Sequence, residues 1–65
     1  MYLFKNEKEI TINQTIASEV IGCDRSFLNQ VLKGQKHCSK MVAYCITKYL
    51  DENAEIEDYF VREEN

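Results

Sequence analysis

Apolar residues recur along the chain in short stripes at helical spacing, and residues that begin or end helices bound each stripe. The first stripe contains Ile16, Ala17, Val20 and Ile21. This spacing predicts a helix at about 14–21 whose apolar face is buried. Asn13 precedes the helix and can accept hydrogen bonds from the free amides of its first turn. Gly22 follows it and readily adopts the positive φ that ends a helix.

A second stripe predicts a helix at about 25–32, between Asp24 as its N-cap and Gly34 as the glycine that ends it. Its apolar residues are Phe27, Leu28, Val31 and Leu32. Its polar residues fall on the other faces, and they are Arg25, Ser26, Asn29, Gln30 and Lys33. We therefore expect a helix that packs with one side and presents hydrogen-bonding groups with the other.

A third helix is predicted at about 40–50, after a polar loop and Ser39 as its cap. It carries the largest apolar stripe, which is Val42, Ala43, Cys45, Ile46, Tyr49 and Leu50. The polar run 51–53 interrupts the pattern. A last amphipathic stretch predicts an acidic C-terminal helix at about 54–63, and its narrow apolar strip is Ile56, Tyr59 and Phe60.

The N-terminal segment fits two structures. Residues 2–4 are apolar and β-prone, and isoleucine alternates with threonine over 10–12, which predicts a β-hairpin with its turn at 5–9. The same segment also fits a short helix at about 2–8 that turns one apolar side chain inward.

Length and composition favour one small helical domain. The chain has 65 residues, of which 45% are hydrophobic and 29% charged, with no proline and two glycines. A chain of this size buries only about 60% of its unfolded surface, so residues 1–65 form one domain with a small core. The scarcity of helix breakers predicts an all-α fold. Without an apolar run of ~20 residues or a secretory signal, we expect a cytoplasmic protein and no membrane partner.

Charge is divided unevenly along the chain. Residues 1–50 carry seven lysines and arginines against four acidic residues, a net charge of +3. Residues 51–65 carry one arginine against seven acidic residues, a net charge of −6. Such asymmetry is typical of a polyanion-binding body with an acidic appendage, although two solvated surfaces of a small protein produce the same pattern.

The sequence contains few signals of a disulfide, a metal site or a catalytic site. Cys23, Cys38 and Cys45 are an odd number of cysteines without a CxxC pair, which favours reduced thiols over a disulfide framework. Metal binding would need His37, next to Cys38, and that spacing fits no common zinc pattern. No nucleophile is paired with a base, and there is no glycine-rich phosphate loop. We therefore expect neither an enzyme nor a bound cofactor or metal.

The two helices on either side of Gly22-Cys23-Asp24 form the pattern of a helix-turn-helix. In that motif the first helix braces the second, and the second enters the major groove of DNA. The connection is tight, and the second helix has an apolar inner face and a polar outer face, as the motif requires.

The segment Gln14–Gly34 resembles the helix-turn-helix of the Cro and phage-repressor (XRE) family. The matching positions are Gln14, Ser18, Gly22, Cys23, Asp24, Leu28 and Val31. In the family they hold the leading glutamine, a small residue, the turn glycine, a buried valine, a capping serine and two core residues of the recognition helix. Two positions depart from the pattern. Ala17 replaces a leucine, so that Ile16 or Val20 must fill the inner face, and Leu32 replaces a residue that is usually polar.

The resemblance covers about residues 13–50 and implies a compact lambda-repressor-like domain of four to five helices. It favours a short helix at about 2–8, because the family packs one there. It also implies a sequence-specific regulator of transcription, of a kind typical of phages and mobile elements. Such a regulator binds double-stranded DNA as a homodimer on two half-sites.

Carried over position by position, the resemblance predicts DNA base contacts by Gln14, Arg25, Ser26 and Gln30. Glutamine can bond bidentately to adenine, and arginine to guanine, in the major groove. Phosphate contacts are predicted for Asn13, Asn29, Lys33, Lys36 and Lys40, since lysines, amides and helix N-termini bind backbone phosphates. Asn29 also fits a position that faces the groove.

The C-terminal strip has two interpretations. Ile56, Tyr59 and Phe60 form either a dimer surface or a part of the monomer's own core, because a small core needs every apolar side chain. The acidic segment would repel DNA, so we predict that it points away from the basic face, with an autoinhibitory position as the alternative. An alternative function is a protein-interaction module, similar to an antirepressor or an antitoxin, that binds a protein partner through the acidic C-terminal helix.

Overall fold

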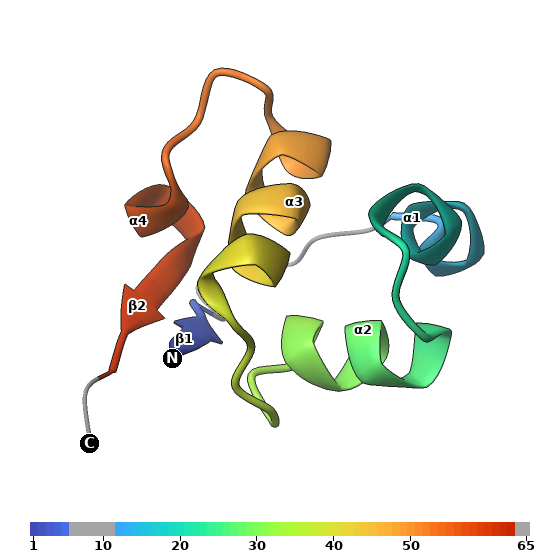
Figure 1. Cartoon of the computed structure of the whole chain (residues 1–65), viewed down its shortest axis with the longest axis horizontal. Helices are drawn as coiled ribbons and strands as arrows, with labels where there is room; N and C mark the ends of the chain where they lie inside the picture. Colours follow the sequence, from blue (N-terminus) through green and yellow to red (C-terminus); the bar gives the residue numbers. More distant parts are fainter. Residues whose placement is uncertain (6–11, 64–65) are drawn as a thin grey trace.

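The structure is a computed structural model that describes residues 1–5 and 12–63 (Figure 1). Its elements in chain order are β1 (Tyr2–Phe4), α1 (Gln14–Ile21), α2 (Arg25–Leu32), α3 (Lys40–Leu50), α4 (Ile56–Tyr59) and β2 (Phe60–Arg62). In Figure 1, α1 and α2 lie on one side of α3, and α4 and the two strands lie on the other. β1 contacts both α2 and α3.

The first three helices begin and end where the sequence predicts, because local side chains bound each of them. Asn13 accepts hydrogen bonds from two amides of the first turn of α1, both at 3.1 Å. Asp24 accepts from two amides of α2 at 2.9 and 3.3 Å, and Ser39 accepts from one amide of α3 at 3.3 Å. Gly22 and Gly34 adopt φ values of 83° and 71°, the left-handed conformation that ends a helix.

The expected all-α fold is wrong, because a two-stranded sheet closes the core. β1 and β2 pair antiparallel, with Leu3 opposite Val61 and Phe4 opposite Phe60. The protein is therefore a compact mixed α/β fold, with four helices and one sheet among its described residues. This pairing joins segments near opposite ends of the described chain, so no local sequence pattern predicts it.

The described start of the N-terminal segment is a strand, which agrees with the first strand of the predicted hairpin and not with the predicted helix. Residues 2–4 form a strand, so the helix at about 2–8 is wrong there. The strand pairs with β2. The rest of the predicted helix, most of the hairpin turn and most of its second strand fall in 6–11, outside the described residues.

The predicted C-terminal helix at about 54–63 is wrong over most of its length. Only Ile56–Tyr59 are helical, and Phe60 then adopts an extended backbone with φ −129° and ψ 150°. The ring of Phe60 meets that of Phe4 edge-to-face, with centroids 5.2 Å apart. Burial of two aromatic rings and a strand partner for the β-prone residues after Tyr59 outweigh the weak helical spacing.

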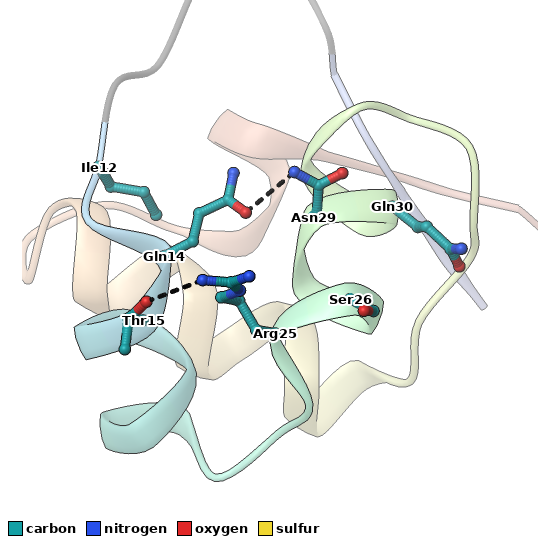
Figure 2. Close-up of a pocket in the computed structure, with 7 residues that line it drawn as sticks. All are labelled: Ile12, Gln14, Thr15, Arg25, Ser26, Asn29 and Gln30. Carbon is teal, nitrogen blue, oxygen red and sulfur yellow. Dashed lines mark hydrogen bonds between the residues drawn. The ribbon is translucent and has the colours of Figure 1, made fainter.

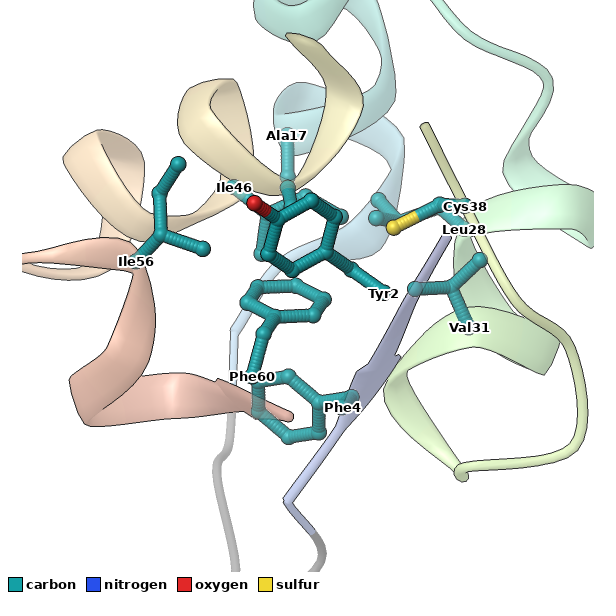
Figure 3. Close-up of a cluster of buried hydrophobic side chains, with 10 residues drawn as sticks. Tyr2, Phe4, Ala17, Leu28, Val31, Cys38, Ile46, Ile56 and Phe60 are labelled. Atoms are coloured by element: carbon teal, nitrogen blue, oxygen red, sulfur yellow. The ribbon is translucent and has the colours of Figure 1, made fainter. Parts of the chain in front are cut away.

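One core unites the helices and the sheet (Figure 3). Its buried residues are Tyr2, Phe4, Ala17, Leu28, Val31, Cys38, Ala43, Ile46, Ile56 and Phe60. Tyr2 has a second role, since its backbone exchanges two hydrogen bonds of 2.9 Å with Cys38 in the loop between α2 and α3. β1 therefore ties the loop that follows α2 to the C-terminal strand.

The inner face of α1 is narrower than its apolar stripe predicts. Ala17 is fully buried and Ile21 partly buried, but Ile16 and Val20 are 51% and 67% exposed. The expectation that Ile16 or Val20 fills the inner face in place of a leucine is wrong. A helix of two turns that packs through the small residues Ala17 and Ser18 buries only a thin strip, so the neighbouring positions turn outward.

Thr47 supplies a stability test, because it is fully buried in α3 and its hydroxyl has no hydrogen-bond partner among the described residues. A buried polar group without a partner costs roughly 1–3 kcal/mol. We predict that Thr47→Val raises the free energy of unfolding by about 1 kcal/mol, because it keeps the shape and removes the hydroxyl. Urea unfolding followed by circular dichroism measures the change. Thr47→Ser is the matched control and should lower stability, and a destabilised valine variant would contradict the prediction.

Candidate nucleic-acid interface

α2 is held to the core by one side only. Leu28 and Val31 have no exposed surface, and Phe27 and Leu32 are partly buried beside them. These positions fix the rotation of the helix about its own axis. The residues on its other side are Arg25, Ser26, Asn29 and Gln30.

This other side of α2 and the start of α1 border an open pocket of about 510 Å³ (Figure 2). The pocket is lined by Ile12, Gln14, Thr15, Arg25, Ser26, Asn29 and Gln30. All four residues that the sequence nominates for base contacts therefore gather at one place. Most of the lining groups are amides and hydroxyls, which can both donate and accept hydrogen bonds, and a guanidinium, which only donates.

Two side-chain hydrogen bonds cross this pocket from α2 to the start of α1 (Figure 2). Nδ2 of Asn29 donates to Oε1 of Gln14 at 3.0 Å, and Nη1 of Arg25 donates to Oγ1 of Thr15 at 3.3 Å. The amide pair is partly buried, whereas Arg25 and Thr15 are exposed. These bonds orient an amide and a guanidinium in advance, which lowers the entropic cost of binding a ligand.

The other nominated residues of α2 and the cap of α1 are all exposed. Ser26 and Gln30 are exposed on α2, and Gln30 extends away from Gln14 in Figure 2. Asn13 is also exposed, but its Oδ1 caps α1. Only the Nδ2 end of Asn13 is therefore left for the phosphate contact that the sequence predicts.

The three lysines predicted to contact phosphate are all exposed. Lys33 and Lys36 lie in the turn after α2, and Nζ of Lys36 lies 5.4 Å from the ring centroid of Phe27. This cation–π contact holds the ammonium close to α2. Lys40 begins α3 and lines a separate pocket of about 360 Å³, together with Met1, Tyr2, Ser39 and Arg62.

The acidic C-terminal segment approaches the basic loop at one point. His37, which follows Lys36, forms an ion pair with Glu63 when its imidazole is protonated. The prediction that the acidic segment points away from the basic face is therefore wrong at Glu63. The cause is the sheet, because β2 runs beside β1 and β1 is itself bonded to the loop at Cys38.

The C-terminal strip does not form an exposed surface. Ile56 and Phe60 are 9% and 1% exposed and belong to the core, and Tyr59 is partly buried with its ring stacked on Phe4, centroids 6.3 Å apart. The structure therefore agrees with the second interpretation, in which this strip is part of the monomer's own core.

Two of the three thiols have raised pKa values. Burial raises the pKa of the Cys38 thiol to about 11. Burial, and to a smaller extent the charge of Asp24, raises the pKa of Cys23. Both thiols are therefore protonated at neutral pH and act as small packing residues. Within the described ranges, no three histidine, cysteine or acidic side chains are grouped so as to hold a metal ion. No helix there has the length and apolar character to cross a membrane.

Sequence reasoning missed three features of the pocket. Ile12 and Thr15 line it although neither was nominated, and Asn29 is bonded across it to Gln14. Thr15 is the neighbour of Gln14 in the first turn of α1, and Asn29 lies three residues after Ser26 on the same side of α2. These positions could have been inferred from helix geometry, but the bond between two long side chains could not.

Asp24 sets the start of the helix that carries this interface. Replacing an N-cap by alanine costs about 0.5–2 kcal/mol. We predict that Asp24→Ala lowers the free energy of unfolding by about 1 kcal/mol, measured in urea, because two amides of α2 lose their acceptor. Asp24→Ser keeps an acceptor and serves as the control. Equal losses in the two variants would show that the cap is not the source of the effect.

Comparisons of the chain with models of protein families, with curated proteins and with solved structures find no match. What the chain does is therefore inferred from the geometry of the pocket between α1 and α2 and from the charges around it.

Proposed function

We propose that the protein is a sequence-specific, DNA-binding regulator of transcription of the phage-repressor and Cro type, and that α2 enters the major groove. One observation carries the proposal, which is the division of α2 into two sides. Leu28 and Val31 are fully buried, whereas Arg25, Ser26 and Gln30 are exposed. A helix held by its apolar side presents its polar side to a groove that is about 12 Å wide and admits a helix.

The exposed side chains have the chemistry that base edges require. The guanidinium of Arg25 can donate two parallel hydrogen bonds to the O6 and N7 atoms of guanine. The amide of Gln30 can bond to adenine, and the hydroxyl of Ser26 can donate or accept. Because these groups stand on one rigid helix, they would meet neighbouring base pairs together.

Phosphate contacts would flank the groove on one side of α2. Lys33 and Lys36 are exposed in the turn that follows the helix, and Lys40 is exposed at the start of α3. Their ammonium groups would neutralise backbone phosphates and release counterions. Asn13 would add one amide donor, its Nδ2 group, at the start of α1, because its Oδ1 already accepts from the first turn.

A single module of this size binds DNA weakly. Proteins of the phage-repressor type meet this limit by placing two copies on half-sites about one helical turn apart. We therefore propose a symmetric dimer on a palindromic operator. The strip Ile56, Tyr59, Phe60 is not its contact surface, since Ile56 and Phe60 belong to the core.

The alternative function has less support. A protein-interaction module would need the acidic C-terminal helix to display its apolar strip. Beyond Ile56–Tyr59 that segment is a strand, and its largest apolar side chain, Phe60, is buried. We therefore do not propose this alternative.

Arg25 provides the test of base contact. Duplexes enriched from a random pool by the intact protein should contain a preferred sequence, and affinity is then measured by fluorescence anisotropy. We expect Arg25→Ala to weaken binding of the preferred duplex by about 1–3 kcal/mol and to relax the preference at one base pair. Arg25→Lys keeps the positive charge but lacks the planar guanidinium. Compared with Arg25→Ala, it should therefore bind all duplexes more tightly, without restoring the preference at that base pair.

A different result would overturn the proposal. If the intact protein enriches no sequence, or if Arg25→Ala and Gln30→Ala bind the preferred duplex as well as the unaltered protein does, then α2 does not read bases. Circular dichroism of each variant shows that the fold is retained.

The lysines provide the test of phosphate contact. We expect Lys33→Ala and Lys36→Ala each to weaken binding equally for preferred and unrelated duplexes. Each should also reduce the slope of log K against log salt concentration by about 1, because one fewer counterion is released. Anisotropy titrations at several salt concentrations measure this slope. A slope that stays unchanged in both variants would place these lysines away from the DNA.

A further inference from the structure

We infer that Asn29, held in place by Gln14, reads one adenine base in the major groove. This inference rests on the proposed function and deepens it, because it assigns a base to a residue for which the sequence leaves both a phosphate contact and a groove-facing position open. The observation behind it is the 3.0 Å hydrogen bond from Nδ2 of Asn29 to Oε1 of Gln14 inside the open pocket.

The bond fixes the orientation of the Asn29 amide, because it holds Nδ2 toward Gln14. A primary amide has two N–H donors and one carbonyl oxygen. One N–H of Asn29 is used on Gln14, so the second N–H and Oδ1 remain for a ligand. Figure 2 shows Oδ1 turned away from Gln14. Asn29 therefore presents one donor and one acceptor side by side.

This arrangement matches adenine and no other base. In the major groove adenine offers the N7 acceptor and the N6 amino donor as neighbours. Guanine offers two acceptors, N7 and O6, and the carbonyl oxygen of Asn29 would be repelled by one of them. Cytosine offers a donor and thymine an acceptor beside a methyl group, so each could satisfy only one half of the amide.

The same geometry argues against a phosphate contact by Asn29. Phosphate oxygens only accept hydrogen bonds. A phosphate that took the remaining N–H of Asn29 would bring its negative charge close to Oδ1, which also only accepts. The lysines after α2 have no acceptor on the side chain and suit phosphate better.

Gln14 acts as a positioning residue. Both amides are partly buried, so the rotation of Asn29 is restricted by its neighbours as well as by the bond. Fixing a side chain before binding removes part of the entropic cost of ordering it in the complex. Loss of Gln14 should therefore weaken the reading of adenine without moving it to another base pair.

The test uses the full chain and a duplex enriched from a random pool. Each adenine of that duplex is replaced in turn by 7-deazaadenine, which lacks only the N7 acceptor. We expect the unaltered protein to lose about tenfold in affinity at one adenine, since a good bidentate pair discriminates by a factor of this order or more. At that position Asn29→Ala should bind the adenine and 7-deazaadenine duplexes equally, and Gln14→Ala should show a reduced difference.

Two further variants complete the design. Asn53→Ala removes an exposed amide from the turn after α3 and should keep the full tenfold difference. Asn29→Asp replaces the amide by a group that only accepts, and should change the preferred base from adenine to cytosine at the same position. This change of preference tests the assignment even if Asn29→Ala does not fold.

The outcomes separate this inference from the function on which it rests. If the unaltered protein enriches no duplex, both fail. If it enriches a duplex in which no adenine is sensitive to loss of N7, or if Asn29→Ala keeps the sensitivity, only the reading of adenine by Asn29 fails. If Gln14→Ala keeps the full tenfold difference, the positioning role of Gln14 is wrong.

Discussion

The complete burial of Leu28 and Val31 is the constraint on which the rest of the interface depends. Neighbouring residues of a helix are separated by about 100° around its axis. A rotation of α2 by one position would bring Asn29 into the core and expose Leu28, at about 1.5–3 kcal/mol for the lost apolar burial and more for an amide without partners. α2 therefore has one stable orientation, and in it Arg25 and Asn29 meet the start of α1 in the same pocket.

The sheet is what makes this burial complete in so short a chain. Three helices of this length leave one end of the core open, and β1 and β2 close it with Phe4 and Phe60. The same strand pair fixes the loop after α2, because the backbone of Tyr2 also forms hydrogen bonds with Cys38 in that loop. The loop that carries Lys36 is thus positioned by segments remote in sequence, and it receives an acidic neighbour from them as well.

Local signals were enough to predict α1, α2 and α3. A capping side chain, an apolar stripe and, for α1 and α2, a closing glycine all lie within a dozen residues, so each signal is visible in the local sequence without knowledge of the rest of the fold. A strand over 2–4 was one of two predicted structures, but β2 and the pairing were missed, because three residues carry little β pattern and the pairing depends on a partner at the other end of the described chain. Phe60 fits a helical strip and a strand equally well, and only Phe4 decides between them. The four nominated base-contact residues were brought together as the helix geometry implied, whereas the bond between Asn29 and Gln14 depends on how closely α1 and α2 approach each other.

The pairing of residues 2–4 with 60–62 also determines when the protein can fold during translation. Helices of 8 to 11 residues do not persist alone in water. While β2 is still inside the ribosome, the emerging chain lacks Phe60 and a partner for β1, so its apolar residues remain exposed to proteases and chaperones. The core can therefore close only after residues 60–62 have left the ribosome, so α2 reaches its buried orientation later than its own position in the sequence would allow.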